Sequence, residues 1–261
     1  MIESILKRDR NVVAAALLAL TALAWAYLVW LNAHMSAAAM PAMPGMNMEP
    51  PNPFAPTELV FAIVMWAVMM VGMMTPSAAP MILLYARIGR QARGQGAIFP
   101  PTGWFAAGYI AVWTAFAIIA GVAQAGLAQM TLVSPMMALN NTIVAGALLL
   151  IAGVWQWLPL KDACLAQCQA PFAFLQRAGG FRRDPAGALK QGTKHGFYCV
   201  GCCWALMVLL FVGGVMNLLW VAALSVFVLL EKLVPAGKII TRAAGLVAII
   251  TGTIFLARTL I

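Results

Sequence analysis

The chain has 261 residues, of which 64% are hydrophobic and only 9% are charged, and its mean hydropathy is +0.92. Soluble domains carry about 25% charged residues, so this composition excludes an ordinary soluble protein. It predicts an all-α fold, a polytopic membrane helical bundle surrounded by the lipid bilayer. The net charge of +9 does not indicate a nucleic-acid partner, because no basic stripe is interleaved with exposed aromatic residues.

Apolar runs of transmembrane length recur along the whole chain. They predict about seven transmembrane helices, at roughly residues 12–31, 57–85, 102–124, 139–159, 197–216, 218–234 and 239–259. The sixth is the weakest, since only Asn217 separates it from the fifth. We therefore expect an N-terminal transmembrane anchor over 1–31, a Met/Pro-rich periplasmic segment over 32–56, and a six-helix membrane core over 57–261 with a cytoplasmic loop at 160–195.

The basic residues predict the orientation of these helices. With seven crossings, 15 of the 16 Lys and Arg residues fall in the N-terminal segment and in alternate connections, and only Arg258 falls on the other side. Cytoplasmic connections are enriched in Lys and Arg, so the N-terminus is predicted to be cytoplasmic. The first run also resembles a signal peptide with small residues at Ala37–Ala39, but its length of about 20 residues favours an uncleaved anchor.

The predicted periplasmic segment contains a soft-ligand pattern. Its many prolines keep it extended, so its side chains are displayed rather than packed. Thioethers bind Cu(I) far better than they bind zinc, calcium or magnesium. The alternative is a Met-rich linker without a ligand role. The candidate capture residues are His34, Met35, Met40, Met43, Met46 and Met48.

The second apolar run predicts a helix with two methionine ladders. At 100° per residue, Met65, Met69 and Met73 share one stripe, and Met70 and Met74 lie in a second stripe beside it. Two prolines, at 76 and 80, are expected to interrupt the inner half, as in the broken helices that line permeation sites. The stripes predict a copper path if they face the bundle interior, although methionine is also a common filler of helix interfaces.

The strongest motif combines cysteines with a histidine near the predicted inner surface. His195, Cys199, Cys202 and Cys203 share one helix face at spacings i, i+4, i+7 and i+8. A second pair, at Cys164 and Cys168, would join them if the inner loop folds back. Thiolates and imidazole are ligands that Cu(I) and Zn²⁺ prefer. Iron–sulfur ligation, a redox pair and inert packing remain the alternatives.

Two carboxylates near the inner helix ends, Asp162 and Glu231, are candidates for supporting the metal ligands or carrying protons; each neighbours a lysine, so interfacial placement is the alternative. The sequence contains no Ser-His-Asp constellation, phosphate-binding glycine loop or paired catalytic carboxylates. We therefore assign no catalytic residues and favour a non-enzymatic role.

Three blocks of sequence, at residues 66–80, 159–168 and 195–207, resemble the DUF2182 family, described as predicted metal-binding integral membrane proteins of bacteria. Shorter matches at 213–217 and 231–232 extend the resemblance over roughly residues 57–258. It implies a bacterial multi-helix inner-membrane protein with a metal site and no settled activity. The Met-rich segment precedes the matched region.

These observations lead to three functional hypotheses. The first is a copper-handling membrane protein that binds Cu(I) through Met, Cys and His and either moves it across the inner membrane or stores it there, with zinc as the alternative metal. The second is an accessory or assembly subunit whose structural metal site docks a membrane copper enzyme. The third is a membrane thiol oxidoreductase. The expected partners are the metal ion and a periplasmic copper chaperone or a larger membrane complex.

Overall fold

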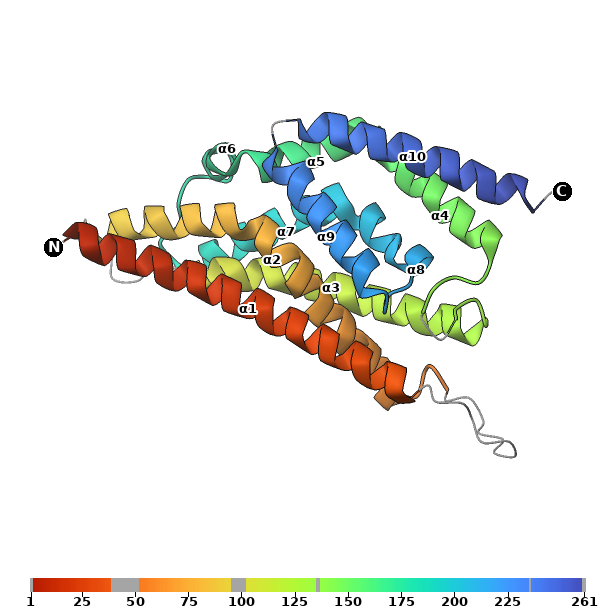
Figure 1. Cartoon of the computed structure of the whole chain (residues 1–261). Coiled ribbons are helices and arrows are strands. Elements are labelled where there is room, and N and C mark those ends of the chain that lie inside the picture. Colours follow the sequence, from red (N-terminus) through yellow and green to blue (C-terminus); the bar gives the residue numbers. More distant parts are fainter. Residues whose placement is uncertain (1, 39–51, 95–101, 135–136, 235, 260–261) are drawn as a thin grey trace.

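A computed structural model describes residues 2–38, 52–94, 102–134, 137–234 and 236–259. In these ranges the regular structure is helical, and the only β-type pairing is an isolated bridge between Val133 and Leu139. This confirms the predicted all-α class. The helices are α1 (Ile2–Ala38), α2 (Pro56–Gly94), α3 (Thr102–Gln129), α4 (Thr142–Trp155), α5 (Pro159–Gln169), α6 (Pro171–Arg177), α7 (Pro185–Val208), α8 (Leu210–Gly213), α9 (Leu218–Leu233) and α10 (Gly237–Ala257) (Figure 1).

Five helices among the described residues are long and apolar enough to cross a membrane, and a sixth crossing results if α4 and α5, which meet at 66°, form one broken span. All seven apolar runs fall on helices, but α9 has only 16 residues. At 1.5 Å per residue it is about 24 Å long, which is shorter than the hydrocarbon core of about 30 Å. The count of transmembrane helices by length and composition is therefore five or six.

The segment 160–195, expected to be a cytoplasmic loop, is mostly helical. It contains most of α5, all of α6 and the first turns of α7. Each of these helices has proline in its first turn, where the missing backbone N–H costs nothing. Asp184 caps α7 by accepting a hydrogen bond from the backbone N–H of Gly187. These helical segments were not predicted because their residues have low hydropathy, and the prediction was based on apolar runs.

Small residues let pairs of helices approach closely. On α3 and α7, a Cβ at Gly108 would overlap the Leu189 carbonyl oxygen, and a Cβ at Gly192 would overlap the Phe105 carbonyl oxygen. The pair formed by α4 and α10 uses the same device, with Gly146 and Gly153 on α4 facing Gly252 and Gly245 on α10. The contacts at Gly108 and Gly192 fix α7 against α3 and so position the cysteines of α7.

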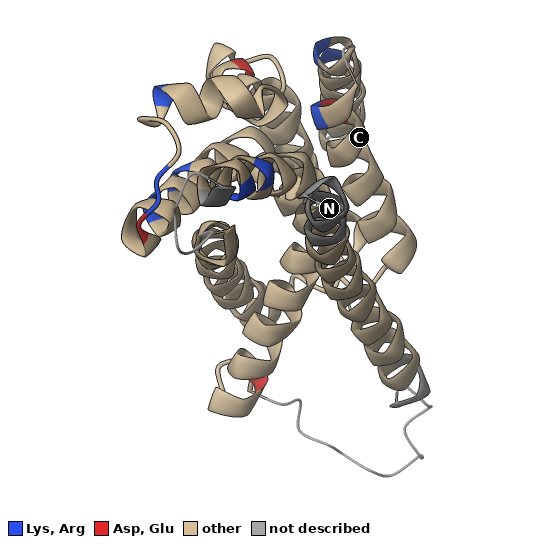
Figure 2. Cartoon of the chain, turned by 90° about the vertical axis from the view of Figure 1, so that its left-hand side faces the viewer, with Lys and Arg blue, Asp and Glu red and all other residues tan. Residues whose placement is uncertain are grey.

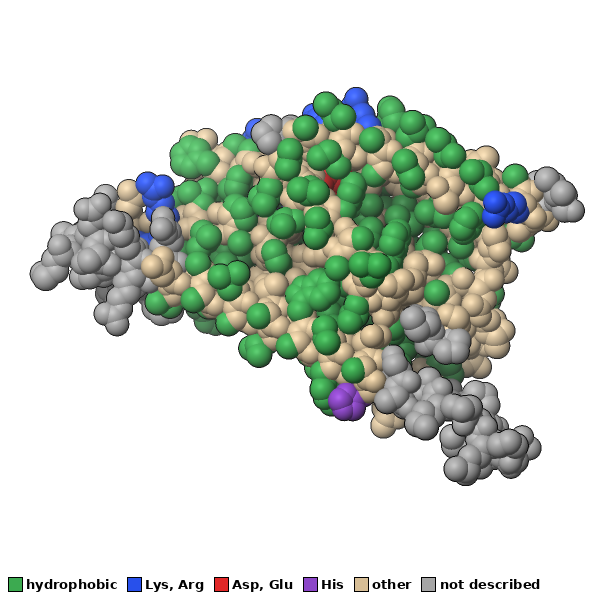
Figure 3. Space-filling view, viewed as in Figure 1, with side chains coloured by type: hydrophobic (Ala, Val, Ile, Leu, Met, Phe, Trp, Pro, Cys, Tyr) green, Lys and Arg blue, Asp and Glu red, His purple; other side chains and the backbone are tan. Residues whose placement is uncertain are grey.

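The surface of the molecule fits a lipid environment. Hydrophobic side chains cover its flank (Figure 3), and the exposed ones include Leu219 and Ile239. Viewed from the end that carries the N-terminus, most of the described Lys and Arg residues gather around that end (Figure 2), whereas Arg258 follows α10 at the other end. The two termini lie at opposite ends of the long axis (Figure 1).

Candidate sulfur-rich metal site

The methionine stripes of α2 face the interior of the bundle. Met65, Met69, Met70, Met73 and Met74 are each at most 1% exposed. The helix stays unbroken through its two prolines, unlike the expected interruption, but it changes direction along its length (Figure 1). Interior prolines bend helices without ending them when neighbouring elements support the backbone. The bend leaves the thioethers in the core.

The four candidate ligands of α7 are also buried, as their shared helix face predicts. His195 is 3% exposed, and Cys199, Cys202 and Cys203 are at most 1% exposed. The thiols of Cys202 and Cys203 donate hydrogen bonds to the backbone carbonyl oxygen of Cys199, over 3.1 and 2.8 Å. These bonds turn both thiols back along the helix toward Cys199.

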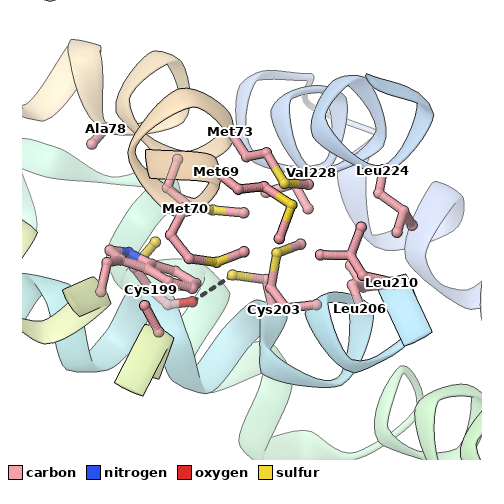
Figure 4. Close-up of a cluster of buried hydrophobic side chains, with 14 of the residues drawn as sticks. Met69, Met70, Met73, Ala78, Cys199, Cys203, Leu206, Leu210, Leu224 and Val228 are labelled. Carbon is pink, nitrogen blue, oxygen red and sulfur yellow. Dashed lines mark hydrogen bonds between the residues drawn. The ribbon is translucent and has the colours of Figure 1, made fainter. Parts of the chain in front are cut away.

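The two sulfur-bearing helices face each other. Met69, Met70 and Met73 project from α2 toward Cys199 and Cys203 on α7, and their sulfur atoms lie in the space between the helices (Figure 4). We call these five residues, together with the buried Cys202, the sulfur cluster. Apolar side chains from α7, α8 and α9 close one side of it, including Leu206, Leu210 and Val228 (Figure 4).

The cysteines of α5 also reach this region. Cys168 packs against the buried core that contains Cys199 and Cys202. Cys164 packs against α7, where its Sγ is 2.9 Å from the position that a Cβ on Gly201 would occupy. Both are partly buried. The fold-back of the inner segment, left open by the sequence, therefore places α5 beside the sulfur cluster.

Two polar residues, Tyr109 and Lys232, contact Cys199, and a third, Ser77, contacts Lys232; none of them was predicted as a site residue. The Tyr109 hydroxyl lies 3.1 Å from Cys199 Sγ and also donates to the Met74 carbonyl oxygen. Lys232 Nζ donates to Cys199 Sγ and to Ser77 Oγ, both over 2.9 Å. Lys232 was counted among the basic residues of a connection, but it is 5% exposed. A charged side chain in an apolar helix is the sequence signal that points to such a role.

His195 lies one helical turn before Cys199, inside an aromatic cage. Its ring centroid is 5.1 Å from that of Phe174, 5.7 Å from Tyr109 and 6.0 Å from Phe105. Among the described residues, its Nδ1 atom has no hydrogen-bond partner. The imidazole is thus a buried nitrogen donor next to the cluster, and its role as a ligand stays a prediction.

The two candidate carboxylates have different surroundings. Asp162 is partly exposed and pairs with Lys238 and Arg242 of α10, at 3.8 and 3.6 Å. Glu231 is fully buried and accepts hydrogen bonds from Lys161 and from the Thr241 hydroxyl, each over 2.5 Å. Their described bonds tie α5, α9 and α10 together, so the structure gives both a role in holding helices.

The candidate capture segment is described only at its start. His34 is exposed, its Nδ1 lies 2.8 Å from the Trp30 carbonyl oxygen, and its ring packs 4.3 Å from that of Trp30. Met35 is partly buried against the core. Met40, Met43, Met46 and Met48 lie outside the described residues.

The donors present favour a soft ion. In the described part of the chain, no three His, Cys, Asp or Glu side chains are arranged to hold one metal ion. A site for a single ion here therefore needs thioether ligands or a small movement of the thiols. Zinc prefers four ligands from Cys, His and carboxylates, whereas Cu(I) accepts thioethers as well as thiolates.

Comparison with known proteins names a family for this core. Residues 63–255 match the model of the family PpoB2, described as a copper chaperone, and this match covers most of the chain. It falls on the same helices as the resemblance to DUF2182. No curated protein and no solved structure matches the chain. The chain therefore belongs to the PpoB2 copper chaperone family, and its function is copper-related.

Proposed function

We propose that this protein binds Cu(I) inside the membrane at the sulfur cluster, holds it there as a chaperone, and passes it on. One observation carries the proposal: the buried thioethers of Met69, Met70 and Met73 on α2 face the buried thiols of Cys199 and Cys203 on α7 (Figure 4). Two helices far apart in sequence thus bring the softest protein ligands to one place.

The chemistry of the cluster supports Cu(I) over Zn²⁺. Thiolate and thioether sulfur are soft donors, which suit a soft monovalent ion. A zinc site closed by four ligands would need several thiolates or imidazoles around one point, and the described Cys and His side chains do not surround one. The site would hold Cu(I) with Cys199, Cys203 and one or more of the three methionines.

The methionine stripe supports movement of copper toward this site. From Met65 to Met74, α2 advances about 14 Å at 1.5 Å per residue, with all five thioethers buried. Thioethers bind Cu(I) more weakly than thiolates do, so they would pass the ion on and Cys199 would retain it. The segment with His34 and Met35 would capture copper at the outer end.

A second candidate function is supply of copper to a partner enzyme in the same membrane. The family description as a copper chaperone favours it, because a chaperone delivers its metal to another protein. In this case the sulfur cluster would hold Cu(I) until it is transferred to the partner enzyme. Recovery of the chain in a stable complex with a copper enzyme would support delivery, and recovery of zinc instead of copper would support a structural metal site.

The test is Cu(I) binding by the detergent-purified protein under reducing conditions, measured by competition with a chromophoric Cu(I) chelator. We expect about one Cu(I) per chain. Cys199→Ser and Cys203→Ser should abolish this binding, and Met70→Leu should weaken it by at least about tenfold, since one of few ligands is lost. Leucine fills a similar volume, so the fold should persist.

Met216→Leu is the matched control. Met216 is a buried methionine 13 residues beyond Cys203, and replacement there should leave Cu(I) affinity unchanged. If Cys199→Ser, Cys203→Ser and Met70→Leu all bind Cu(I) as the unmodified protein does, the sulfur cluster is not the copper site.

A further inference from the structure

Lys232 places a buried positive charge at the sulfur cluster. Its Nζ is 2.9 Å from Cys199 Sγ and 2.9 Å from Ser77 Oγ, and the side chain is 5% exposed. The three contacting residues come from α9, α7 and α2, so the ammonium joins the elements that build the site. The burial of a lysine carries a large desolvation cost unless a partner offsets it.

The described carboxylates of α5 and α9 are engaged elsewhere. Glu231, the chain neighbour of Lys232, pairs with Lys161. Asp162 pairs with Lys238 and Arg242 at the partly exposed edge of α5. Within the described ranges, Lys232 forms no ion pair with a carboxylate, and its polar contacts are a hydroxyl and a thiol. Besides the Ser77 hydroxyl, the polar atom that the geometry places against the ammonium is therefore Cys199 Sγ.

We propose that Lys232 is the specificity-determining residue of this site: its fixed positive charge beside Cys199 selects monovalent soft ions against divalent ones. This inference rests on the proposed function, because it takes Cys199 as a copper ligand. It extends that function by naming the ions that the site excludes. Zn²⁺ is the divalent competitor that also prefers thiolates.

The selectivity follows from Coulomb's law. An ion bound to Cys199 would lie about 4–5 Å from the ammonium, and the repulsion is proportional to the charge of the ion. Zn²⁺ is repelled twice as strongly as Cu(I) at the same position. Even with the screening of bulk water, removal of the ammonium changes the ratio of the two affinities by about fivefold, and a drier site gives more. Any effect of Lys232 on forming the thiolate is common to both ions and cancels in the ratio.

The experiment measures the dissociation constants of Cu(I) and Zn²⁺ for the purified full chain and for four variants. Lys232→Met and Lys232→Gln remove the charge, and the glutamine keeps a hydrogen-bond donor for Ser77 if the methionine variant fails to fold. Lys232→Arg keeps the charge. Lys238→Met removes a mostly exposed charge near the same end of the bundle and is the matched control.

We expect the two uncharged variants to shift the ratio of affinities toward Zn²⁺ by at least about fivefold, and the Arg and Lys238 variants to keep the original ratio. If Cu(I) binds through Cys199 but the uncharged variants keep the original ratio, the selectivity role is overturned and the copper site stands. If Cys199→Ser binds Cu(I) as the unmodified chain does, the selectivity role fails; if Cys203→Ser and Met70→Leu do so as well, the copper site also fails.

Discussion

Lys161 and Glu231 form a buried ion pair that joins α5 to α9. Both side chains are fully buried, and the Lys161 ammonium also bonds to the Gln156 side chain, while Thr241 of α10 donates to Glu231. Lys161 was assigned to a cytoplasmic loop by its place after an apolar run, and its burial corrects that assignment. The Lys161 ammonium is tolerated here because it bonds to both Gln156 and Glu231 Oε1, whereas Glu231 Oε2 has no hydrogen-bond partner among the described residues.

Breaking this pair should destabilise the protein strongly. Lys161→Met leaves the Glu231 carboxylate buried without its cation, which costs about 3–5 kcal/mol. Asp162→Asn, which weakens a partly exposed pair with α10, should cost less than about 1 kcal/mol. Thermal unfolding in detergent measures both, and equal shifts of the two midpoints would contradict the structural importance of the buried pair.

At the scale of elements, the close packing of α3 on α7 positions Cys199. Glycines at 108 and 192 let the two backbones approach, and this approach brings the Tyr109 hydroxyl to 3.1 Å from Cys199 Sγ. The cage around His195 also includes Phe105 and Tyr109 of α3. The geometry of the sulfur cluster thus depends on two residues that have no side chain.

Gly192→Ala should separate these helices and damage the site. The added Cβ would overlap the Phe105 backbone carbonyl, which cannot move without shifting α3, and overpacking of this kind costs about 1–3 kcal/mol or more. We expect a lower unfolding midpoint together with weaker Cu(I) binding. Gly126→Ala in α3 meets no atom within 4 Å and is the control; it should keep or raise the midpoint, since alanine favours helix. Similar losses in the two variants would contradict the packing argument.

At the scale of the whole molecule, charge and hydrophobicity are segregated. Most described basic residues gather at one end (Figure 2), and hydrophobic side chains cover the flank (Figure 3). The connection between α6 and α7, which contains Arg183, and the loop that leads into α4, which contains Asn140, lie toward opposite ends of the long axis (Figure 1). The excess of cytoplasmic Lys and Arg predicts that the end with Arg183 faces the cytoplasm.

Labelling of introduced cysteines tests this orientation. In intact cells, a membrane-impermeant maleimide should react with Asn140→Cys but reach Arg183→Cys only after permeabilisation, because the bilayer blocks a charged reagent. The unmodified chain, with its partly and fully buried native cysteines, gives the background. The reverse pattern would show that the N-terminal end faces outward.

The fold class, the membrane environment and the groups of sulfur ligands follow from the order of amino acids alone. Low charge and recurring apolar runs of transmembrane length predict a helical bundle. In the bilayer every backbone N–H and C=O group must find its hydrogen-bond partner within the protein, and a helix provides these partners within the same segment. Helical periodicity of 3.6 residues also sufficed to place Cys199, Cys202 and Cys203 on one face and the α2 methionines in stripes, all of which are buried.

Which of these stripes meet depends on how the helices pack. Contact between α2 and α7 depends on how helices more than 100 residues apart pack, and periodicity within one helix carries no information about its neighbour. For the same reason the sequence assigned Lys161 and Lys232 to connections. Their burial follows from the partners that packing supplies, Glu231 for one and Cys199 for the other. Burial of a charge is a property of the assembled bundle, because the offsetting partner comes from another helix.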